Sequence, residues 1–221
     1  MPTLTFFKQL GLFILPDFLD PESRVSLWRQ MAAAPAEEAV VVGPRGEQQL
    51  DLATRKVDCC LPSKEVRVRL EQRLQEIKPE IERHFGLRLS NCETPQYLIY
   101  APGDFFKPHL DAGDYGGQNF TSSRRVSVVI FLNRQSQEPA EDAYGEGQFT
   151  LYGLLDGPQW EKCACPLDAE PGLLIAFPSD KWHEVKPVSH GRRFTVVTWF
   201  HDPETQAVDV KPAKPAWPIA I

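Results

Sequence analysis

The sequence predicts a mainly β protein, a sandwich or barrel with helical buttresses on one face. Two stretches with helix-capping residues come first, between about residues 20 and 86. From about residue 94, short apolar runs follow one another, separated by turns rich in glycine and proline. Helices in one half of a chain and short strands in the other favour a β core covered by helices.

The N-terminal part first predicts a strand and a capped helix. Leu12–Leu15 is a short apolar run of strand length. Asp20 is a favourable N-cap and Pro21 suits the first helical position, so a helix should run from there to about Ala34. The stretch Ala36–Gln49 contains glycines and a proline and predicts a turn or hairpin.

A second, longer helix is predicted to begin at Ser63. Apolar residues recur from there at helical spacing as far as Gly86. Pro79 lies inside this pattern, and its ring removes one backbone hydrogen bond. We therefore expect a kink or a restart of the helix at that residue.

The C-terminal half predicts a series of strands rich in β-branched and aromatic residues. The strand at 126–132 is nearly all apolar, which is typical of a strand buried on both faces. The predicted strands are Gln96–Tyr100, Val126–Leu132, Gln148–Tyr152, Leu173–Phe177 and Phe194–Phe200.

The length of 221 residues suits a single domain with extensions. We expect an N-terminal buttress over residues 1–92 and a β core over residues 93–202. Residues 203–221 contain several prolines and predict an extended tail.

Composition and charge exclude several functional classes. Hydrophobic residues make up 42% and charged residues 24%, as is ordinary for a globular protein. The formal net charge of −6 lacks the basic footprint that nucleic-acid binding needs. No apolar stretch approaches the length of a membrane span, and the N-terminus does not predict a signal peptide. Neither a nucleic acid nor a membrane is expected as a partner.

The cysteines predict a reducing environment. The chain has five, an odd number, and they show neither a disulfide framework nor the paired spacing of a zinc site. We interpret them as free, partly buried thiols. A cytoplasmic location is therefore expected.

The strongest chemical signal is a His-x-Asp pair followed by a distant histidine. His109 and Asp111 are two residues apart, so on a strand their side chains would share a face. His183 comes later, after a predicted strand and a turn. Two histidines and one carboxylate are the ligand set of non-haem Fe(II) oxygenases, which keep positions open for a co-substrate and oxygen. A lone His-x-Asp more often marks a surface hydrogen bond, so the assignment depends on the residues downstream of His183.

Arg193 supplies that further signal. It lies in the apolar strand after His183, where a buried guanidinium without a partner would be costly. A guanidinium can form a bidentate ion pair with a dicarboxylate such as 2-oxoglutarate. An ordinary surface ion pair is the competing interpretation, and it suits the adjacent Arg192, which should point to solvent.

Together these residues resemble the prolyl-4-hydroxylase-like branch of the 2-oxoglutarate/Fe(II) dioxygenases. The resemblance covers about residues 97–201, roughly half of the chain. It rests on seven positions in a fixed order: Tyr100, Gly103, His109, Asp111, His183, Arg193 and Trp199. It implies a double-stranded β-helix, a jelly-roll of two facing sheets, and an oxidoreductase that uses Fe(II), 2-oxoglutarate and O2. Ascorbate is a candidate reductant for such an enzyme.

The resemblance also implies roles for individual residues. His109, Asp111 and His183 would bind the iron. Arg193 would bind the distal carboxylate of 2-oxoglutarate, with Tyr100 and Thr195 assisting. The segment Ala112–Arg125 would form a mobile lid, although a passive surface hairpin fits its composition too. The candidate substrate contacts are Tyr115, Phe120, Arg124, Arg125 and Trp199.

Several functions stay open from the sequence. The first is a hydroxylase of a prolyl or other residue in a peptide or protein. A second is a hydroxylase of a free amino acid or small metabolite. A third is a jelly-roll binding module that has lost catalysis, against which the complete ligand set and Arg193 argue. A metal-dependent cupin is disfavoured because no His-x-His pair with a nearby glutamate is found. The oligomeric state is not predicted.

Overall fold

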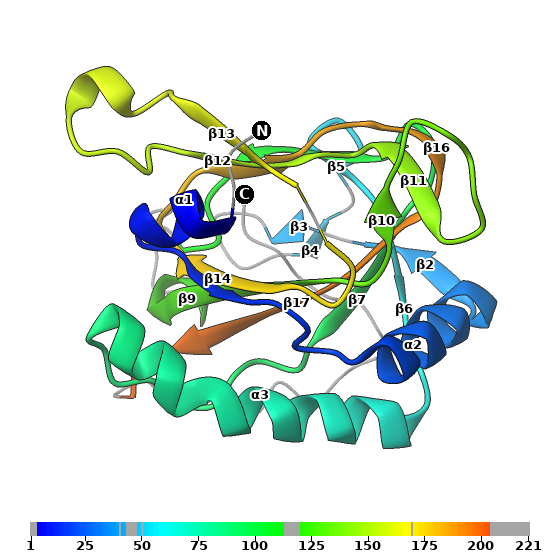
Figure 1. Cartoon of the computed structure of the whole chain (residues 1–221), viewed down its shortest axis with the longest axis horizontal. Helices are drawn as coiled ribbons and strands as arrows, with labels where there is room; N and C mark the ends of the chain where they lie inside the picture. Colours follow the sequence, from blue (N-terminus) through cyan, green and yellow to red (C-terminus); the bar gives the residue numbers. More distant parts are fainter. Residues whose placement is uncertain are drawn as a thin grey trace.

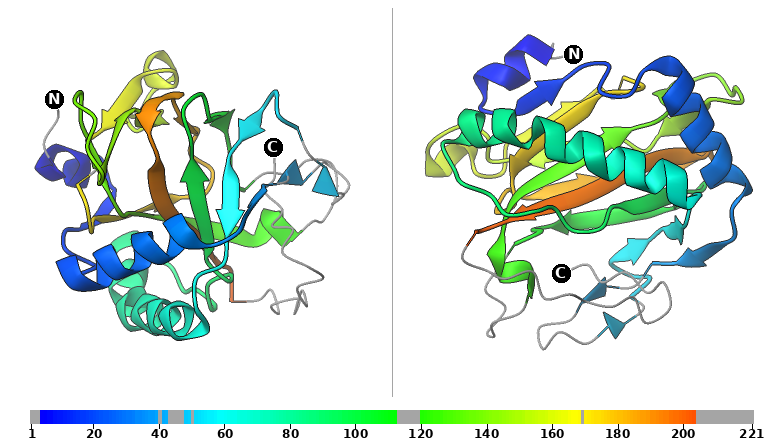
Figure 2. Two further views of the ribbon diagram at one scale, coloured as in Figure 1. Left: turned by 90° about the vertical axis from the view of Figure 1, so that its right-hand side faces the viewer. Right: turned by 90° about the horizontal axis from the view of Figure 1, so that it is seen from below.

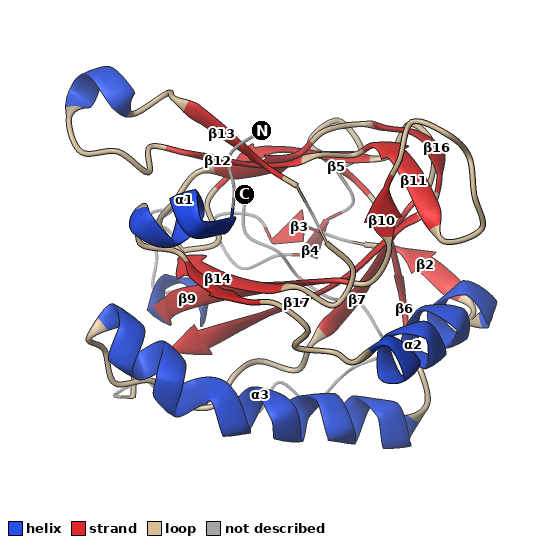
Figure 3. Ribbon diagram, viewed as in Figure 1, coloured by secondary structure: helices blue, strands red, loops and turns tan. Residues whose placement is uncertain are grey.

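Two antiparallel sheets face each other and enclose the core (Figures 1 and 3). The structure, a computed structural model, describes residues 4–39, 41–42, 48–49, 51–112, 120–168 and 170–203. Within these residues the larger sheet runs, in spatial order, β1 (Phe13–Leu15), β14 (Leu174–Pro178), β9 (Arg124–Phe131), β17 (Arg193–His201), β7 (Gln96–Tyr100), β6 (Asp58–Cys60) and β2 (Ala36–Glu38). The smaller sheet runs β13 (Ala164–Leu167), β12 (Phe149–Tyr152), β15 (His183–Val185), β8 (Phe105–His109) and β5 (Arg55–Lys56). The predicted jelly-roll class is confirmed.

Shorter elements complete the sheets. A three-stranded sheet contains β10 (Arg134–Gln135), β11 (Ala143–Glu146) and β16 (Val188–Gly191). The hairpin predicted after the first long helix is found as β3 (Val41–Val42) paired with β4 (Gln48–Gln49). Short 3-10 helices lie at Phe120–Ser123 and Pro158–Trp160.

Helices cover the outer face of the larger sheet (Figure 2). They are α2 (Pro21–Ala33) and α3 (Lys64–Phe85), whereas α1 (Leu4–Gln9) places Phe7 in the apolar cluster between the sheets. The predicted cap of α2 is confirmed, because the Asp20 side chain accepts a hydrogen bond of 2.9 Å from the Ser23 backbone amide. The expected restart at Pro79 is wrong, since α3 is continuous through it. Pro79 is exposed, so water can solvate the carbonyl that its ring leaves without a donor.

Strand periodicity divides the apolar side chains into two layers. In β17, Phe194, Val196 and Phe200 belong to the cluster packed against α2 and α3. The alternate residues of the same strand, which include Val197 and Trp199, belong to the cluster between the sheets. Because the period of a strand is two, Arg193 and Thr195 also point into the space between the sheets.

A glycine fixes the start of β17. Gly191 has a φ of 68°, in the left-handed region that favours glycine. A Cβ at this position would collide with the backbone carbonyl oxygen of Ala143 on β11. The tight contact between β11 and the turn before β17 therefore requires Gly191, and it sets the position from which Arg193 enters the core.

The N-terminal segment contributes strands to both sheets. β1, β2 and β6 join the larger sheet, and β5 joins the smaller one beside β8. Residues from the first part of the chain can thus reach the interior between the sheets.

Some predictions fall on parts of the chain outside the description. They concern the tail after residue 203, the central residues 113–119 of the predicted lid, and Tyr115 within it. Among the described residues, no helix is both long and apolar enough to cross a membrane.

Candidate active site

The three predicted metal ligands come together at one place between the sheets. His109 ends β8 and His183 begins β15, and the two residues face each other directly in the register of the smaller sheet. Asp111 follows two residues after His109. Its carboxylate oxygens lie 3.3 Å from His183 Nε2 and 3.7 Å from His109 Nε2. All three side chains are buried, and one ligand atom of each lies within 4.8 Å of the others.

Backbone hydrogen bonds orient both imidazoles in the same way. His109 Nδ1 lies 2.9 Å from the carbonyl oxygen of Lys107, and His183 Nδ1 lies 2.9 Å from that of Lys181. A ring whose Nδ1–H donates to a carbonyl carries its lone pair on Nε2. Both Nε2 atoms point toward Asp111. Phe106 stacks on the His109 ring at 3.4 Å between centroids and further fixes its plane.

Hydrogen bonds also hold the carboxylate of Asp111. Ser127, on β9 of the larger sheet, donates a hydrogen bond of 2.7 Å to Asp111 Oδ2. Ser127 Oγ lies 2.9 Å from Ser179 Oγ, and the carbonyl of Ser179 accepts the Asp111 amide at 3.1 Å. These contacts connect the two sheets at the site and set the direction of the carboxylate.

The electrostatic surroundings favour the protonation states that bind a metal ion. Burial, followed by the neighbouring His183, holds the pKa of His109 well below its usual range, so this imidazole is neutral. Burial alone would raise the pKa of Asp111, but the neighbouring groups, His183 first, and the hydrogen bond from Ser127 together outweigh it and lower that pKa. A neutral imidazole and a carboxylate are the forms that coordinate a divalent ion.

Nitrogen and oxygen donors in this number fit Fe(II). Two imidazoles and one carboxylate occupy one face of an octahedral ion and keep the other face open. Among the residues that the structure describes, this is the one cluster of His, Cys, Asp and Glu that could hold a metal ion.

Arg193 lies in the same cavity as the cluster. The cavity is lined by both histidines and Asp111 together with Leu98, Tyr100, Thr195, Trp199 and other largely apolar residues. The Arg193 side chain is buried, and its Nη1 donates a hydrogen bond of 3.3 Å to Thr195 Oγ1. Its Nε and Nη2 have no hydrogen-bond partner. A buried cation with unused donors is costly by itself, so this end of the cavity is suited to an anion.

Tyr100 lies beside this guanidinium. It faces Arg193 across the β7–β17 register, with the Arg193 guanidinium carbon 5.1 Å from its ring centroid. Burial raises the pKa of Tyr100 in spite of the nearby Arg193, so its hydroxyl keeps its proton. It can therefore donate a hydrogen bond to a bound carboxylate.

Comparison with known proteins identifies the family of this fold and site. The profile of the 2OG-Fe(II) oxygenase superfamily matches residues 95–201, which span β7 to β17 and include the metal cluster and Arg193. Residues 95–201, just under half of the chain, belong to this superfamily. Among curated proteins, the chain is 28% identical over 127 residues to a PKHD-type hydroxylase from Rippkaea orientalis, covering 56% of this chain and 51% of the relative. It is 27% identical over 106 residues to a PKHD-type hydroxylase from Crocosphaera subtropica, covering 48% and 41%. The matches therefore span about half the length of these relatives or less.

Solved structures share the fold of this chain. A prolyl-4-hydroxylase from Pseudomonas putida superposes with a TM-score of 0.63 at 22% identity, covering 87% of this chain and 92% of that one. A prolyl hydroxylase from Trichoplax adhaerens, in complex with a hypoxia-inducible-factor peptide fragment, superposes with a TM-score of 0.66 at 18% identity, covering 94% and 90%. At these identities the likeness shows the fold.

The predicted substrate contacts have different surroundings. Trp199 lines the cavity that holds the metal cluster. Arg124 is buried, its guanidinium carbon lies 3.7 Å from the Trp199 ring centroid, and it donates hydrogen bonds of 2.6 and 2.9 Å to Glu93. Arg125 is exposed and forms an ion pair with Asp202. Tyr115 and the side chain of Phe120 lie outside the described part of the chain.

Several residues near the metal cluster had no signal in the sequence. Ser127 lies in an apolar run, and only the folded pairing of β9 shows that it reaches Asp111. Arg55 comes from the N-terminal segment, is fully buried, and stacks on Phe106 at 5.0 Å from the ring centroid. A lone arginine in an unpatterned stretch gives no indication of such a position.

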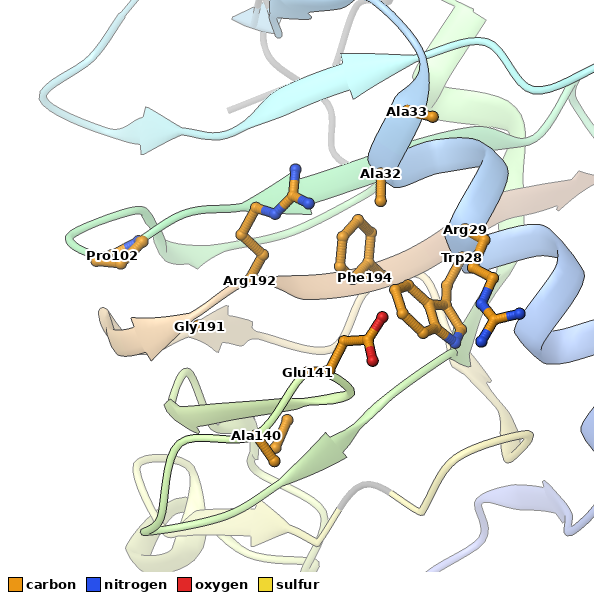
Figure 4. Close-up of a pocket in the computed structure, with 11 residues that line it drawn as sticks. Trp28, Arg29, Ala32, Ala33, Pro102, Ala140, Glu141, Gly191, Arg192 and Phe194 are labelled. Carbon is orange, nitrogen blue, oxygen red and sulfur yellow. The ribbon is translucent and has the colours of Figure 1, made fainter.

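A second hollow lies on the outer surface, away from the metal cluster (Figure 4). Arg192 lies there with its guanidinium carbon 5.2 Å from the Phe194 ring centroid, and Trp28 and Arg29 of α2 line the same hollow. The neighbouring arginines 192 and 193 therefore point in opposite directions, as strand alternation predicts. Arg192 is exposed, in agreement with the expectation from the sequence.

We predict that Ser127→Ala weakens Fe(II) binding by about 10- to 100-fold, the usual effect of losing a hydrogen bond to a metal ligand. The change removes the donor to Asp111 Oδ2 and little volume. Equilibrium titration of the apoprotein with Fe(II) under anaerobic conditions measures the effect. Ser189→Ala, on β16 away from the cluster, is the matched control and should keep the wild-type affinity. Equal affinities for both variants would mean that Ser127 does not hold the carboxylate in its binding position.

Proposed function

We propose that this oxygenase is a 2-oxoglutarate- and Fe(II)-dependent hydroxylase that acts on a prolyl or other residue in a peptide or protein. The observation that carries the proposal is the shared cavity, which has the His-Asp-His cluster at one place and the incompletely paired Arg193 at another. A metal ligand set and a separate cation in one cavity match a co-substrate with a chelating end and a distal carboxylate.

One end of the cavity would bind the metal ion, and the other would bind the distal carboxylate of the co-substrate. His109, Asp111 and His183 would hold the iron through their Nε2 and carboxylate atoms. Arg193 would bind the distal carboxylate of 2-oxoglutarate with the two nitrogens that lack a partner, and Tyr100 would donate a further hydrogen bond. Thr195 orients the guanidinium by accepting from Nη1. These contacts place the co-substrate before any substrate enters.

When bound, Fe(II) supplies the chemistry that couples decarboxylation of 2-oxoglutarate by O2 to hydroxylation of a C–H bond, giving succinate and CO2. The protein excludes water from this reaction. Leu98, Val185 and Phe106 line the cavity and are buried, which keeps the space around the cluster apolar. Bulk solvent would otherwise compete for the open positions of the metal.

The names of similar proteins support a peptide or protein as substrate. The curated relatives are described as PKHD-type hydroxylases, and one structural neighbour is a prolyl hydroxylase in complex with a peptide fragment. The net charge of −6 disfavours a nucleic-acid substrate. A cytoplasmic location and ascorbate as a reductant belong to the same proposal, and the five free cysteines are compatible with a reducing compartment.

The proposal predicts a visible charge-transfer band when the apoprotein is mixed anaerobically with Fe(II) and 2-oxoglutarate. The band should be lost in His109→Ala, which removes one metal ligand. His84→Ala is a matched control, because His84 lies on α3 outside the cluster and should keep the band. A folded protein that binds Fe(II) and shows no band with 2-oxoglutarate would contradict the proposed function and favour a binding module.

A further inference from the structure

Two more buried polar atoms lack a partner, one on Trp199, which lines the cavity, and one on Gln96, beside it on β7. Gln96 Oε1 and Trp199 Nε1 are buried without a hydrogen bond, and both side chains are 2% exposed. Trp28 Nε1 and Tyr97 Oη are also without a partner, but these residues pack in the cluster between the larger sheet and the helices. Gln96 and Trp199 belong instead to the inner faces of β7 and β17.

The strand register locates this pair beyond the co-substrate end of the cavity. Across β7 and β17, Arg193 faces Tyr100, Thr195 faces Leu98, and Val197 faces Gln96. Leu98, Tyr100, Val197 and Trp199 all line the cavity, and Gln96 shares its face with the first two. Trp199 is the next inward residue after Val197, so it is the diagonal neighbour of Gln96, and the Cα atoms of such neighbours are generally about 7–8 Å apart. The pair is thus separated from Arg193 by the layer of Thr195 and Leu98.

The indole of Trp199 is held rigidly. The guanidinium of Arg124 lies against its ring, 3.7 Å from the centroid, and Glu93 holds that guanidinium with hydrogen bonds of 2.6 and 2.9 Å. Arg124 Nη1 also lies 3.3 Å from the carbonyl oxygen of Asp111. A side chain packed in this way cannot rotate to find another partner, so its N–H keeps a fixed place relative to the metal cluster.

The chemistry of the two atoms selects a complementary ligand. An indole N–H can only donate a hydrogen bond, and the oxygen of a carboxamide can only accept one. Each is destabilising while it is buried without a partner. A ligand that satisfies both must offer an acceptor and a donor a short distance apart. The C=O and N–H of a secondary amide meet this requirement.

We propose that Trp199 and Gln96 form a specificity-determining pair that recognises, by hydrogen bonding, a secondary amide beside the carbon to be hydroxylated. Trp199 Nε1 donates to the carbonyl of the amide, and Gln96 Oε1 accepts its N–H. If the target residue is prolyl, its own nitrogen carries no hydrogen, so the amide is the peptide bond on its carboxyl side. This inference rests on the proposed function, because it takes the Arg193 end of the cavity as the place of 2-oxoglutarate.

The test compares two small probes that differ in one N–H. The protein is loaded with Zn(II) in place of iron and with 2-oxoglutarate, and its affinities for N-acetylproline N-methylamide and N-acetylproline methyl ester are measured by ligand-observed NMR. The wild-type protein should bind the amide at least about tenfold more tightly, because the ester leaves Gln96 Oε1 without a donor. The same samples first report whether 2-oxoglutarate binds.

Two variants separate the roles of the two residues. In Gln96→Leu the preference for the amide should disappear, since both probes then meet an apolar side chain. In Trp199→Phe the affinity for both probes should fall about tenfold while the amide preference remains, since both probes carry the carbonyl. Thermal unfolding of each variant confirms that it is folded.

Equal affinity of the wild-type protein for the two probes, or no binding of either, would overturn the inference and leave the proposed function standing. An amide preference that persists in Gln96→Leu would likewise overturn it. Failure of 2-oxoglutarate itself to bind would overturn the proposed function and the inference together.

Discussion

Replacing Arg193 with methionine is expected to weaken 2-oxoglutarate binding on the order of 10²- to 10³-fold, because truncating one partner of a buried charge pair costs about 2–5 kcal/mol. The variant should nevertheless be at least as stable as the wild-type protein without ligand. Nε and Nη2 of Arg193 are buried without a partner, so the free protein carries part of the desolvation cost of the cation. Methionine fills a similar space and carries no charge.

Two measurements check both halves of this prediction. Anaerobic titration of the Fe(II)-loaded protein gives the dissociation constant of 2-oxoglutarate, and thermal unfolding with and without 2-oxoglutarate gives the stability. Binding should raise the melting temperature of the wild-type protein and leave that of Arg193→Met nearly unchanged at the same concentration.

Arg192→Met is the matched control for this variant. It removes the same charge from the adjacent residue, which is exposed on the outer face beside Phe194. Its affinity for 2-oxoglutarate should equal that of the wild-type protein. A similar loss in both variants would mean that the effect comes from net charge, and the assignment of Arg193 would then be wrong.

The shared face of His109 and Asp111 was predictable from local spacing, whereas the distant His183 was grouped with them through the family resemblance. His109 and Asp111 are close in the chain, and strand periodicity predicts that they share a face. The predicted strand Gln96–Tyr100 agrees with β7 at both ends, and the cap at Asp20 predicted the start of α2. Continuous apolar runs and capping residues are local properties, so they can be identified without knowledge of the pairing.

Contacts that depend on which β-strands pair, and in which register, were not predictable from the sequence. The strand β8 contains Lys107 and Pro108, and its apolar residues are too few to form a clear run. The contact of Ser127 with Asp111 exists because β9 and the loop after β8 meet across the two sheets. The position of Arg55 beneath Phe106 depends on β5 joining the smaller sheet. In each case the partner is distant in sequence, and only the register brings it near.

The two ends of the cavity also differ in how far their buried polar groups are already hydrogen-bonded within the protein. The metal ligands are hydrogen-bonded in the protein without ligand, through Lys107, Lys181 and Ser127. The donors of Arg193 are only partly used. The metal end is therefore organised before binding, whereas the Arg193 end gains its remaining hydrogen bonds from the ligand. Binding energy at that end is available to select a dicarboxylate.

Replacing Asp111 with alanine is expected to weaken Fe(II) binding on the order of 10²-fold or more, and to abolish 2-oxoglutarate turnover. The loss should exceed that of Ser127→Ala, because a ligand is removed instead of a hydrogen bond to a ligand. Two imidazoles would remain, without the negative charge that the buried site offers the ion. Fe(II) titration and succinate formation measure the two effects.

Asp104→Asn is a matched control for the loss of a buried carboxylate. Asp104 is 4% exposed and forms an ion pair of 2.9 Å with Lys56, outside the metal cluster. Its replacement should lower the free energy of unfolding and leave the Fe(II) affinity unchanged. An equal fall in affinity in both variants would show that general destabilisation, and not the loss of a ligand, explains the result for Asp111.

The double variant Asp111→Ala/Ser127→Ala then tests whether Ser127 affects metal binding only through Asp111 or also by a second route. If Ser127 acts on the metal only through its 2.7 Å hydrogen bond to Asp111, its removal should cost nothing further once Asp111 is gone. The double variant should then bind Fe(II) as Asp111→Ala does. Additive losses would instead show that Ser127 affects the ion by a second route, for example through Ser179, whose backbone carbonyl holds the Asp111 amide. The cycle thus shows whether the larger sheet influences the metal only through the Asp111 carboxylate.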